Sequence, residues 1–401
     1  MKVPLLDLKP QFKSLEQGLK KAVNDVLEST QYIMGPKPEE LERKIAGYVG
    51  TKYAIGVSSG TDALLICLMA LDLVPGDLVI TTPYSFFATA GVIARVHANP
   101  VFVDIDPKTY NMNPEKLCSW FKKNSKRRSR VKAIMPVHLY GQCADMDAIC
   151  GIAQEYNIPV IEDAAQAIGS QYPSKTGVKK AGSIGLGGCF SFFPSKNLGG
   201  IGDGGIVTTN DEGFADKVRK LRTHGAERVY YHSLVGGNFR LDAIQAAALL
   251  VKLPYLDQWH EMRRNNAAYY DENFKNSAFR IPPCRGEVTI GMSRRRTHSA
   301  LHIPFIAYKR EYHIYNQYVI SVSEKRDELR EFLQDSEIGC AVYYPVPFHE
   351  QECFKYLGYK TGDFPKSEYA SKHTLALPIY PELTREMQDC VIGKIKEFYS
   401  K

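Results

Sequence analysis

One lysine of the sequence follows a short apolar strand and enters a glycine-rich turn. The segment CFSFFPSKNLGG, residues 189–200, reads as a buried strand that ends at Pro194 and is followed by Ser195 and Lys196. A lysine at a strand end is ordinarily a solvated surface residue. In a parallel sheet, however, ligands bind beyond the carboxyl ends of the strands. Lys196 is therefore a candidate catalytic residue, and the segments around it decide between the two interpretations.

Two carboxylates end a second apolar strand. In NIPVIEDAAQA, residues 157–167, Glu162 and Asp163 follow the apolar run, and Gln166 comes three residues later, about one helical turn on. We therefore expect Asp163 and Gln166 to face the same way. A carboxylate keeps a neighbouring pyridine nitrogen protonated, which makes the cofactor pyridoxal 5′-phosphate (PLP) an electron sink. The alternative, that Asp163 caps the next helix, fits the sequence equally well.

A third segment has the composition of a phosphate site. GVSSGTDALLICLMAL, residues 56–71, is a turn of small residues that opens a helix. Free backbone N–H groups and the helix dipole favour a dianion there, Gly60 allows its close approach, and Ser59 or Thr61 adds a donor. An ordinary Ser/Thr helix cap is the simpler interpretation of this segment alone.

Three glycines nearby fit the pattern GxGxxG without its usual context. Gly200, Gly202 and Gly205 precede the strand IVTT, whereas a dinucleotide fingerprint follows a strand and opens a helix. We interpret this loop as a turn that lets the backbone pass close to a cofactor.

The elements that position these residues alternate between short apolar runs and helix-period segments from about residue 50 to 210. That alternation predicts an α/β domain with a mostly parallel sheet. The predicted strands are 78–81, 101–104, 131–137, 159–161, 189–192 and 205–208.

The pattern changes near residue 254. A helix over 255–274 leads into a basic, proline-marked segment, 282–311, and then a strand (315–322), a helix (324–339) and a second strand (340–347) are predicted. A chain of 401 residues exceeds the size at which one core usually stops growing. We therefore predict a large α/β domain over 1–254 and a smaller α+β domain over 255–401.

The formal net charge of +7 comes largely from two basic runs, 122–130 and 294–296. We interpret them as solvated loops, with steering of an anionic substrate as the alternative. A nucleic-acid-binding protein would rest on the charge alone, and no nucleic-acid partner is expected.

Nine cysteines occur without a CxxC pair or a Cys/His metal spacing, so reduced thiols and no metal site are expected. The first residues lack a signal-peptide core, and the longest apolar runs fall far short of the roughly 20 residues that span a bilayer. We predict a cytoplasmic protein without a membrane segment.

With these residues assembled, the chain resembles the sugar-nucleotide aminotransferases of the DegT/StrS type over nearly its whole length. The motifs that carry the resemblance are VPLLDL (3–8), YIMGP (32–36), SSGTDAL (58–64), VHLYGQCADMDAI (137–149), VIEDAAQA (160–167), SFFPSKNLGGIGDGG (191–205), GGNFRLDAIQAA (236–247), YPVPFH (344–349) and LGYKTGDFP (357–365). The resemblance implies the aspartate-aminotransferase-like fold of PLP-dependent transferases (fold type I) and a homodimer with active sites at the subunit interface.

The resemblance also implies a role for each matching residue. Lys196 resembles the lysine that binds PLP as a Schiff base, Asp163 the partner of the ring nitrogen, and Gln166 the contact to the phenolic oxygen. Gly60, Thr61 and Ser191 match phosphate contacts, Asn238 matches a phosphate ligand from the neighbouring subunit, and Phe86 matches the aromatic residue that stacks on the ring. Without the resemblance, Phe86 would be interpreted as a core residue.

The implied reaction moves an amino group from L-glutamate to a keto sugar linked to UDP or dTDP, for surface-polysaccharide or deoxyamino-sugar biosynthesis. The stretches GQCAD and HGAERVYYH are most similar to members that aminate C3, including a UDP-N-acetyl-3-oxoglucuronate branch. Two departures leave the sugar open: Tyr343 stands where the family usually has histidine, and the basic segment 282–311 is longer than usual. The alternatives are a sugar dehydratase, which has histidine in place of Lys196, an aminotransferase acting on a cyclitol, and a regulatory protein without PLP.

Overall fold

The larger part of the protein is built on a central sheet. The computed structural model describes residues 1–275 and 301–400. Two groups of strands, in the orders β1-β9-β8-β5 and β3-β2-β4, are joined by isolated bridges from Ile134 to Val160 and from Val137 to Asp163. The strands are β1 (Tyr53–Val57), β2 (Leu78–Thr81), β3 (Asn99–Phe102), β4 (Val131–Ile134), β5 (Ile161–Asp163), β8 (Gly187–Ser191) and β9 (Gly205–Thr209).

The strand directions confirm the predicted mostly parallel sheet. β2 runs parallel to β3 and β4, and β5 runs parallel to β8, whereas β9 is antiparallel to both of its neighbours. In the register of β5 and β8, Asp163 lies opposite Cys189. The carboxyl ends of both strands therefore meet at one edge of the sheet, where the predicted site lies.

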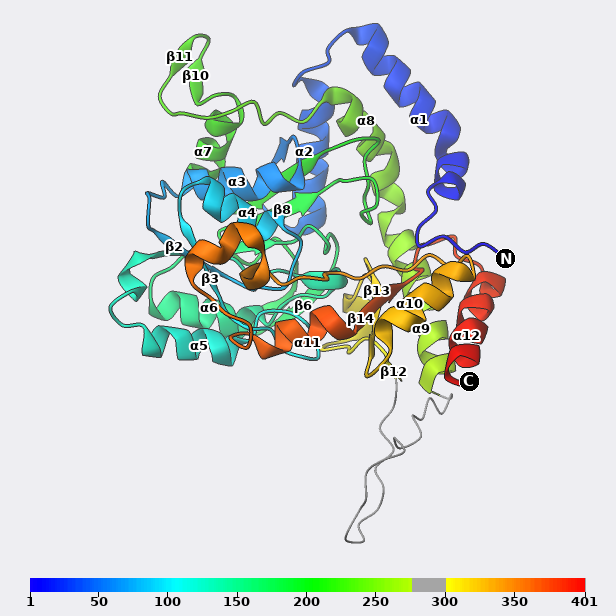
Figure 1. Ribbon diagram of the computed structural model, residues 1–401. Helices are drawn as coiled ribbons and strands as arrows, with labels where there is room; N and C mark the ends of the chain where they lie inside the picture. The colour runs from blue at the N-terminus through cyan, green and yellow to red at the C-terminus, as the bar shows by residue number, and fades with distance from the viewer. Residues whose placement is uncertain (276–300, 401) are drawn as a thin grey trace.

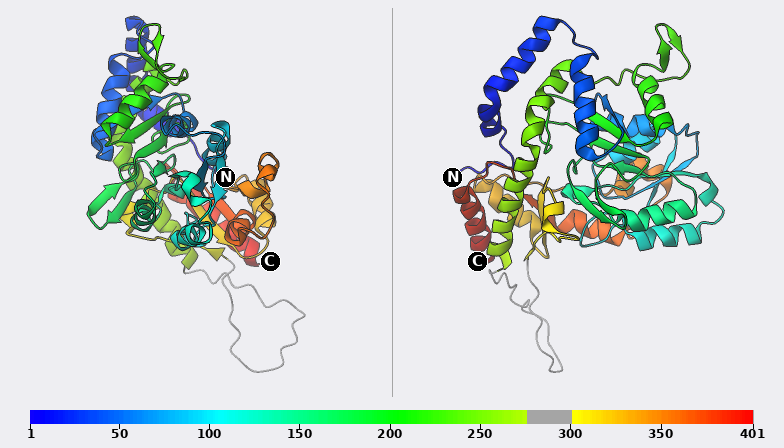
Figure 2. Two further views of the ribbon diagram at one scale, coloured as in Figure 1. Left: turned by 90° about the vertical axis from the view of Figure 1, so that its left-hand side faces the viewer. Right: turned by 180° about the vertical axis from the view of Figure 1, so that it is seen from behind.

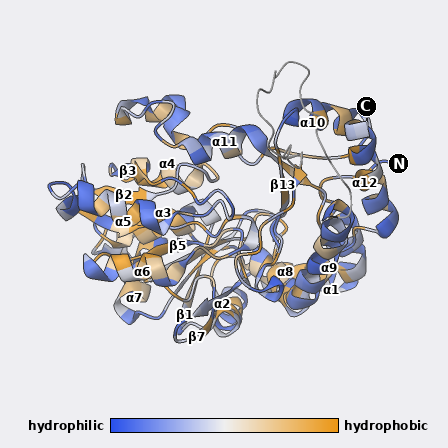
Figure 3. Ribbon diagram, turned by 90° about the horizontal axis from the view of Figure 1, so that it is seen from below, coloured by the Kyte–Doolittle hydropathy of each residue, from blue (hydrophilic) through white to orange (hydrophobic). Residues whose placement is uncertain are grey.

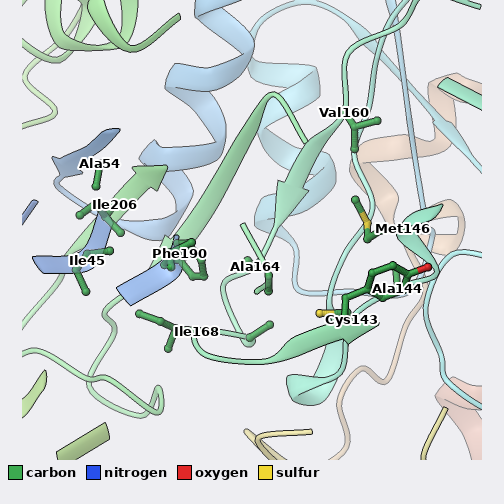
Figure 4. Packing of buried hydrophobic residues seen from close by; sticks show 14 of the residues in the cluster. Ile45, Ala54, Cys143, Ala144, Met146, Val160, Ala164, Ile168, Phe190 and Ile206 are labelled. Carbon is green, nitrogen blue, oxygen red and sulfur yellow. The ribbon is translucent and has the colours of Figure 1, made fainter. Parts of the chain in front are cut away.

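Helices cover both faces of this sheet (Figure 1). Alternate residues of a strand point to opposite faces, and Ile206 and Val207 accordingly belong to different buried clusters. Figure 4 shows Ile206 together with Phe190, which belongs to the same buried cluster. The helices of this part are α1 (Lys9–Ser29), α2 (Pro36–Val49), α3 (Gly60–Ala70), α4 (Ala88–Arg95), α5 (Pro114–Lys123), α6 (Met146–Glu155), α7 (Glu212–Arg222) and α8 (Ala243–Lys252).

The C-terminal part has its own buried core around a three-stranded antiparallel sheet. The sheet consists of β12 (Leu301–His302), β13 (Tyr318–Val322) and β14 (Thr374–Leu377). The helices are α9 (Leu256–Lys275), α10 (Arg326–Asp335), α11 (Pro365–His373) and α12 (Arg385–Ser400). Figure 2 shows α9 running from the large sheet into this part. Trp259 of α9 belongs to the core of the large part, and Tyr270 belongs to the C-terminal core.

The first residues of the chain join the C-terminal part as well. Val3 is fully buried in the C-terminal core, its N–H donates to Glu337, and its carbonyl accepts from the Gly339 N–H at 2.7 Å. The boundary near residue 254 stays a prediction. In Figure 3, apolar residues concentrate along the strands and the inner helix faces of both parts.

Several predicted elements have different bounds in the structure. The strand predicted over 159–161 is β5, which begins at Ile161 and includes Asp163, and the helix predicted over 324–339 is the shorter α10. The strand predicted over 340–347 is wrong: in the described part of the chain, Ala341 alone of these residues makes a bridge, with Ala376 of β14. Pro345 and Pro347 lack the N–H groups that a sheet strand needs.

Two short hairpins complete the described fold. They are β6 (Gln171–Ser174) with β7 (Gly177–Lys180) and β10 (Ala226–Arg228) with β11 (Tyr231–His232). The basic run 122–130 lies at the surface around the end of α5, and 294–296 lies outside the described residues. The eight cysteines in the described ranges are free thiols. Within those same ranges, no helix is both long and apolar enough to cross a membrane.

An ion pair buried between α7 and α2 leads to a prediction about stability. Arg222 donates to Glu42 at 2.5 Å, and both side chains are largely shielded from water. Arg222→Met should lower the free energy of unfolding by about 3–5 kcal/mol, because it leaves the Glu42 charge buried without its partner. Urea denaturation followed by circular dichroism measures the loss.

The control removes the same charge from the surface of the same helix. Lys220 pairs with Glu227, and both side chains are about 40% exposed, so Lys220→Met should cost at most about 1 kcal/mol. Equal losses in the two variants would contradict the assigned role of burial.

Candidate active site

Lys196 lies in the turn that follows β8. The turn is fixed by backbone hydrogen bonds from Phe192 to Gly204, from Lys196 to Phe193 and from Gly200 to Phe192. Burial disfavours the charged ammonium and lowers the pKa of Lys196 from its ordinary 10.5 to about 8, while the Asp163 carboxylate acts in the opposite direction. A substantial fraction of this amine is therefore neutral at mildly alkaline pH.

Asp163 ends β5 and is only 4% exposed. Its Oδ2 accepts a hydrogen bond from Thr89 Oγ1 at 2.7 Å, and its Oδ1 accepts from the Ala165 N–H at 3.2 Å. Burial raises the pKa of Asp163, and the hydrogen bonds from Thr89 and Ala165, together with Lys196, oppose that rise. Residues 164–170 form turns, so the alternative that Asp163 caps a helix is wrong.

Glu162, next to Asp163, has a structural role, because its carboxylate is hydrogen-bonded within the protein. Its buried carboxylate accepts from the N–H groups of Gly182, Ile184 and Gly185 at 2.6–2.8 Å and bonds His138 Nε2 at 2.9 Å. His138 Nδ1 accepts from the Ala144 N–H, so Nε2 carries the proton that it donates to Glu162. Every oxygen of Glu162 is thus engaged, and Asp163 is the carboxylate left to face a ligand.

The Gln166 side chain is held by two tyrosines that the sequence did not indicate. Its Oε1 accepts from the Tyr140 N–H at 2.8 Å, and its Nε2 donates to the Tyr344 hydroxyl at 2.9 Å. The amide orientation is unambiguous, because a backbone N–H can only donate. Among the residues that the structure describes, the second amide hydrogen of Gln166 has no acceptor, so it is available to a ligand.

The first turn of α3 meets the end of β8 at very short range. A Cβ added to Gly60 would lie 2.6 Å from Ser191 Cβ, so only glycine allows this approach. The Ser59 hydroxyl caps the helix by accepting from the Asp62 N–H, so the simpler interpretation is confirmed for Ser59. Among the hydrogen bonds of the described residues, the N–H groups of Gly60 and Thr61 have no acceptor. With Ser191, they form a cradle that fits a phosphate group.

Phe86 and Asn238, which the sequence predicts as site residues, both have exposed side chains. Phe86 is 58% exposed, with its ring centroid 6.2 Å from that of Tyr344, so it is not a core residue. Asn238 is exposed and follows the projecting β10–β11 hairpin (Figure 1). The adjacent Phe239 carbonyl accepts from the Ser58 N–H of the phosphate turn at 2.9 Å.

The whole chain is similar to a known protein family and to several of its members. Residues 13–396 match the model of the DegT/DnrJ/EryC1/StrS aminotransferase family. A "pleiotropic regulatory protein" of Geobacillus stearothermophilus is 44% identical, over 100% of this chain and 99% of the relative. The "UDP-2-acetamido-2-deoxy-3-oxo-D-glucuronate aminotransferase" of Pseudomonas aeruginosa is 39% identical, over 95% of this chain and 96% of the relative.

Solved structures show the same fold. A DegT/DnrJ/EryC1/StrS aminotransferase from Brucella abortus superposes with a TM-score of 0.88 at 37% identity, covering 100% of both chains. NtdA from Bacillus subtilis, solved with the bound cofactor PMP, has a TM-score of 0.84 at 29% identity, covering 100% of this chain and 86% of its own.

Burial and the Asp163 carboxylate act in opposite directions on the pKa of Lys196, and this leads to a prediction for the protein without a ligand. The rate at which an amine-reactive reagent labels Lys196 should rise with pH around a midpoint of about 8. Asp163→Asn removes the charge that raises this pKa, so the midpoint should fall by about one pH unit. Peptide mass spectrometry of pulse-labelled protein measures both midpoints.

The control is Asp145→Asn, which changes a carboxylate that caps α6 and should leave the midpoint unchanged. A midpoint that rises in Asp163→Asn would contradict the assigned interaction.

Proposed function

We propose that this protein transfers an amino group from L-glutamate to C3 of a keto sugar linked to UDP or dTDP. The chain belongs to the DegT/DnrJ/EryC1/StrS aminotransferase family and is a PLP-dependent sugar aminotransferase. The observation that carries the proposal is the position of Asp163 at the end of β5 and of Lys196 after the parallel strand β8, at one sheet edge beside a phosphate cradle. The phosphate cradle would hold a cofactor, and Lys196 and Asp163 would hold or move protons.

The residues present fit PLP. The N–H groups of Gly60 and Thr61 and the Ser191 hydroxyl would hold the phosphate, because a helix N-terminus favours a dianion. Gln166 would contact the phenolic oxygen, and the exposed Phe86 ring would stack on one face of the cofactor. PLP bound here supplies an electron sink that stabilises negative charge on the substrate carbon.

Asp163 would hold the proton on the cofactor's ring nitrogen. A carboxylate favours a protonated partner only when it is ionised, and burial alone works against that. The hydrogen bonds from Thr89 and Ala165 stabilise the ionised form. Thr89 thereby belongs to the site as the residue that orients Asp163 and keeps it charged.

Lys196 would bind the cofactor and act as the general base. With a pKa lowered to about 8, Nζ is protonated and deprotonated with little cost near neutral pH. As a neutral amine, Nζ would take the proton from the α-carbon of the amino donor, and as an ammonium it would hold that proton until it is returned to the reacting molecule. The same amine can then serve the second half of the reaction, in which the keto sugar is the acceptor.

The choice of C3 and of a nucleotide-linked sugar is supported by the relative from Pseudomonas aeruginosa, whose name specifies a 3-oxo sugar attached to UDP. The dehydratase alternative is disfavoured, because the sugar dehydratases have a histidine at the position where this chain has Lys196. Cyclitol substrates and a regulatory role are outcomes that the assay below distinguishes. A cytoplasmic location and a role in polysaccharide or deoxyamino-sugar biosynthesis belong to the same proposal.

We further propose a homodimer whose active sites are shared. Several apolar side chains near the site and along the hairpin are exposed, among them Phe86, Phe193, Ile201, Tyr230 and Val235. A second copy of the chain that covers these side chains would remove their apolar surface from water. A second copy that covers this surface would bring Asn238 of one chain to the phosphate cradle of the other.

The function is tested with purified protein, PLP, L-glutamate and a panel of keto sugars linked to UDP or dTDP. We expect one panel member to gain an amino group at C3, detected by mass spectrometry, and borohydride to fix the cofactor on Lys196. Lys196→Ala should lower the rate by roughly 10³-fold or more, because it removes the base. Borohydride labelling of another lysine, with an active Lys196→Ala variant, would contradict the assignment.

The shared site is tested by mixing two inactive variants. Asn238→Asp places a negative charge against the phosphate, and each 1.4 kcal/mol of lost binding weakens affinity about tenfold. After dissociation and reassembly with Lys196→Ala, heterodimers contain one site with both changes and one with neither. Activity should reappear in the mixture. If Asn238 serves the site of its own chain, every site carries a defect and the mixture stays inactive.

A further inference from the structure

Tyr344 belongs to the C-terminal part of the protein and contacts Gln166 of the candidate site. It lies in the irregular segment that follows the pairing of Ala341 with Ala376 of β14. The carbonyl of the preceding Tyr343 accepts hydrogen bonds from the hydroxyls of Tyr84 and Tyr140, both from the large part. The backbone at Tyr344 is therefore fixed from both parts of the protein.

The Tyr344 ring is packed on the side of the site where Phe86 lies. Its centroid is 6.2 Å from the centroids of both Tyr84 and Phe86, and it makes an edge-to-face contact with Tyr84. Such a ring has little freedom to turn its hydroxyl elsewhere.

The Tyr344 hydroxyl accepts a hydrogen bond but donates none to the residues that the structure describes. Its oxygen accepts from Gln166 Nε2 at 2.9 Å. Among the hydrogen bonds within 1–275 and 301–400, its own proton has no acceptor. A phenol that accepts from one neighbour has a donor left to offer, and here the donor lies beside the amide that is proposed to contact the cofactor's phenolic oxygen.

The surroundings keep this phenol protonated. Burial and the nearby Asp163 carboxylate both raise the pKa of Tyr344. Tyr344 is thus a neutral donor throughout the pH range in which an enzyme works.

The geometry points to Tyr344 as a positioning residue that donates a hydrogen bond to the phenolic oxygen of PLP, next to Gln166, and so connects the C-terminal part to the cofactor. This inference rests on the proposed function, in which Gln166 contacts the same oxygen. The donor stabilises the negative oxygen most when the nitrogen joining Lys196 to the cofactor has lost its proton, because that proton otherwise shares the charge. Tyr344 should therefore lower the pH at which this nitrogen is deprotonated.

The test is a pH titration of the visible absorption of the PLP-loaded protein without substrate. In Tyr344→Phe the midpoint should rise by about one pH unit, since the donor to the deprotonated state is lost. Fluorescence titration of the cofactor-free variant should show PLP binding weakened by about fivefold, as expected for one lost hydrogen bond.

Tyr343→Phe is the matched control, because it removes the neighbouring hydroxyl, for which no partner occurs among the described residues, and its midpoint should not move. An unchanged midpoint in Tyr344→Phe overturns the inference and leaves the aminotransferase function intact. A wild-type protein that gains no visible band with PLP overturns the function itself. If Tyr344→Phe does not fold, 3-fluorotyrosine at position 344 provides a stronger donor, and the midpoint must then fall.

Discussion

The buried Glu162 carboxylate connects the end of β5 to the chain that leads into β8, and the candidate site depends on this connection. Three backbone N–H groups from residues 182–185 and the His138 ring converge on it. A buried carboxylate without such donors would cost several kcal/mol. Because the donors come from the turn just ahead of β8, they fix where that strand begins, and thereby where it delivers Lys196 relative to Asp163.

Burial acts in opposite directions on the two ionisable groups of the site. It lowers the pKa of Lys196 and raises the pKa of Asp163, and the attraction between them reduces both shifts. Each group is therefore easier to convert to its neutral form than it would be in water. The Thr89 hydroxyl opposes the effect of burial on Asp163, because its hydrogen bond favours the carboxylate form.

The sequence was sufficient to identify the residues that lie at strand ends. Lys196, Asp163 and Gly60 each follow or end an apolar run, and the parallel arrangement of the strands brings such positions to one edge. The contacts that orient them could not be read from local patterns. Thr89 and Tyr344 lie 74 and 178 residues from their partners Asp163 and Gln166, and hydrogen bonds over such separations have no signature in spacing. A strand was predicted at Tyr344 because residues 340–347 form a largely apolar run that contains β-branched residues. Pro345 and Pro347, which interrupt sheet pairing, were given too little weight.

The pairing of Val3 with residues 337–339 has a consequence for how the molecule is made. The residues that pair with Val3 are synthesised more than 330 residues after it. Translation at about 5–20 residues per second separates the two events by tens of seconds. The large sheet has its strands by residue 209 and can form while Val3 is still unpaired. The C-terminal core, to which Val3 belongs, therefore cannot be complete until residues 337–339 have been synthesised, and the contact of Tyr344 with Gln166 likewise has to wait for residue 344.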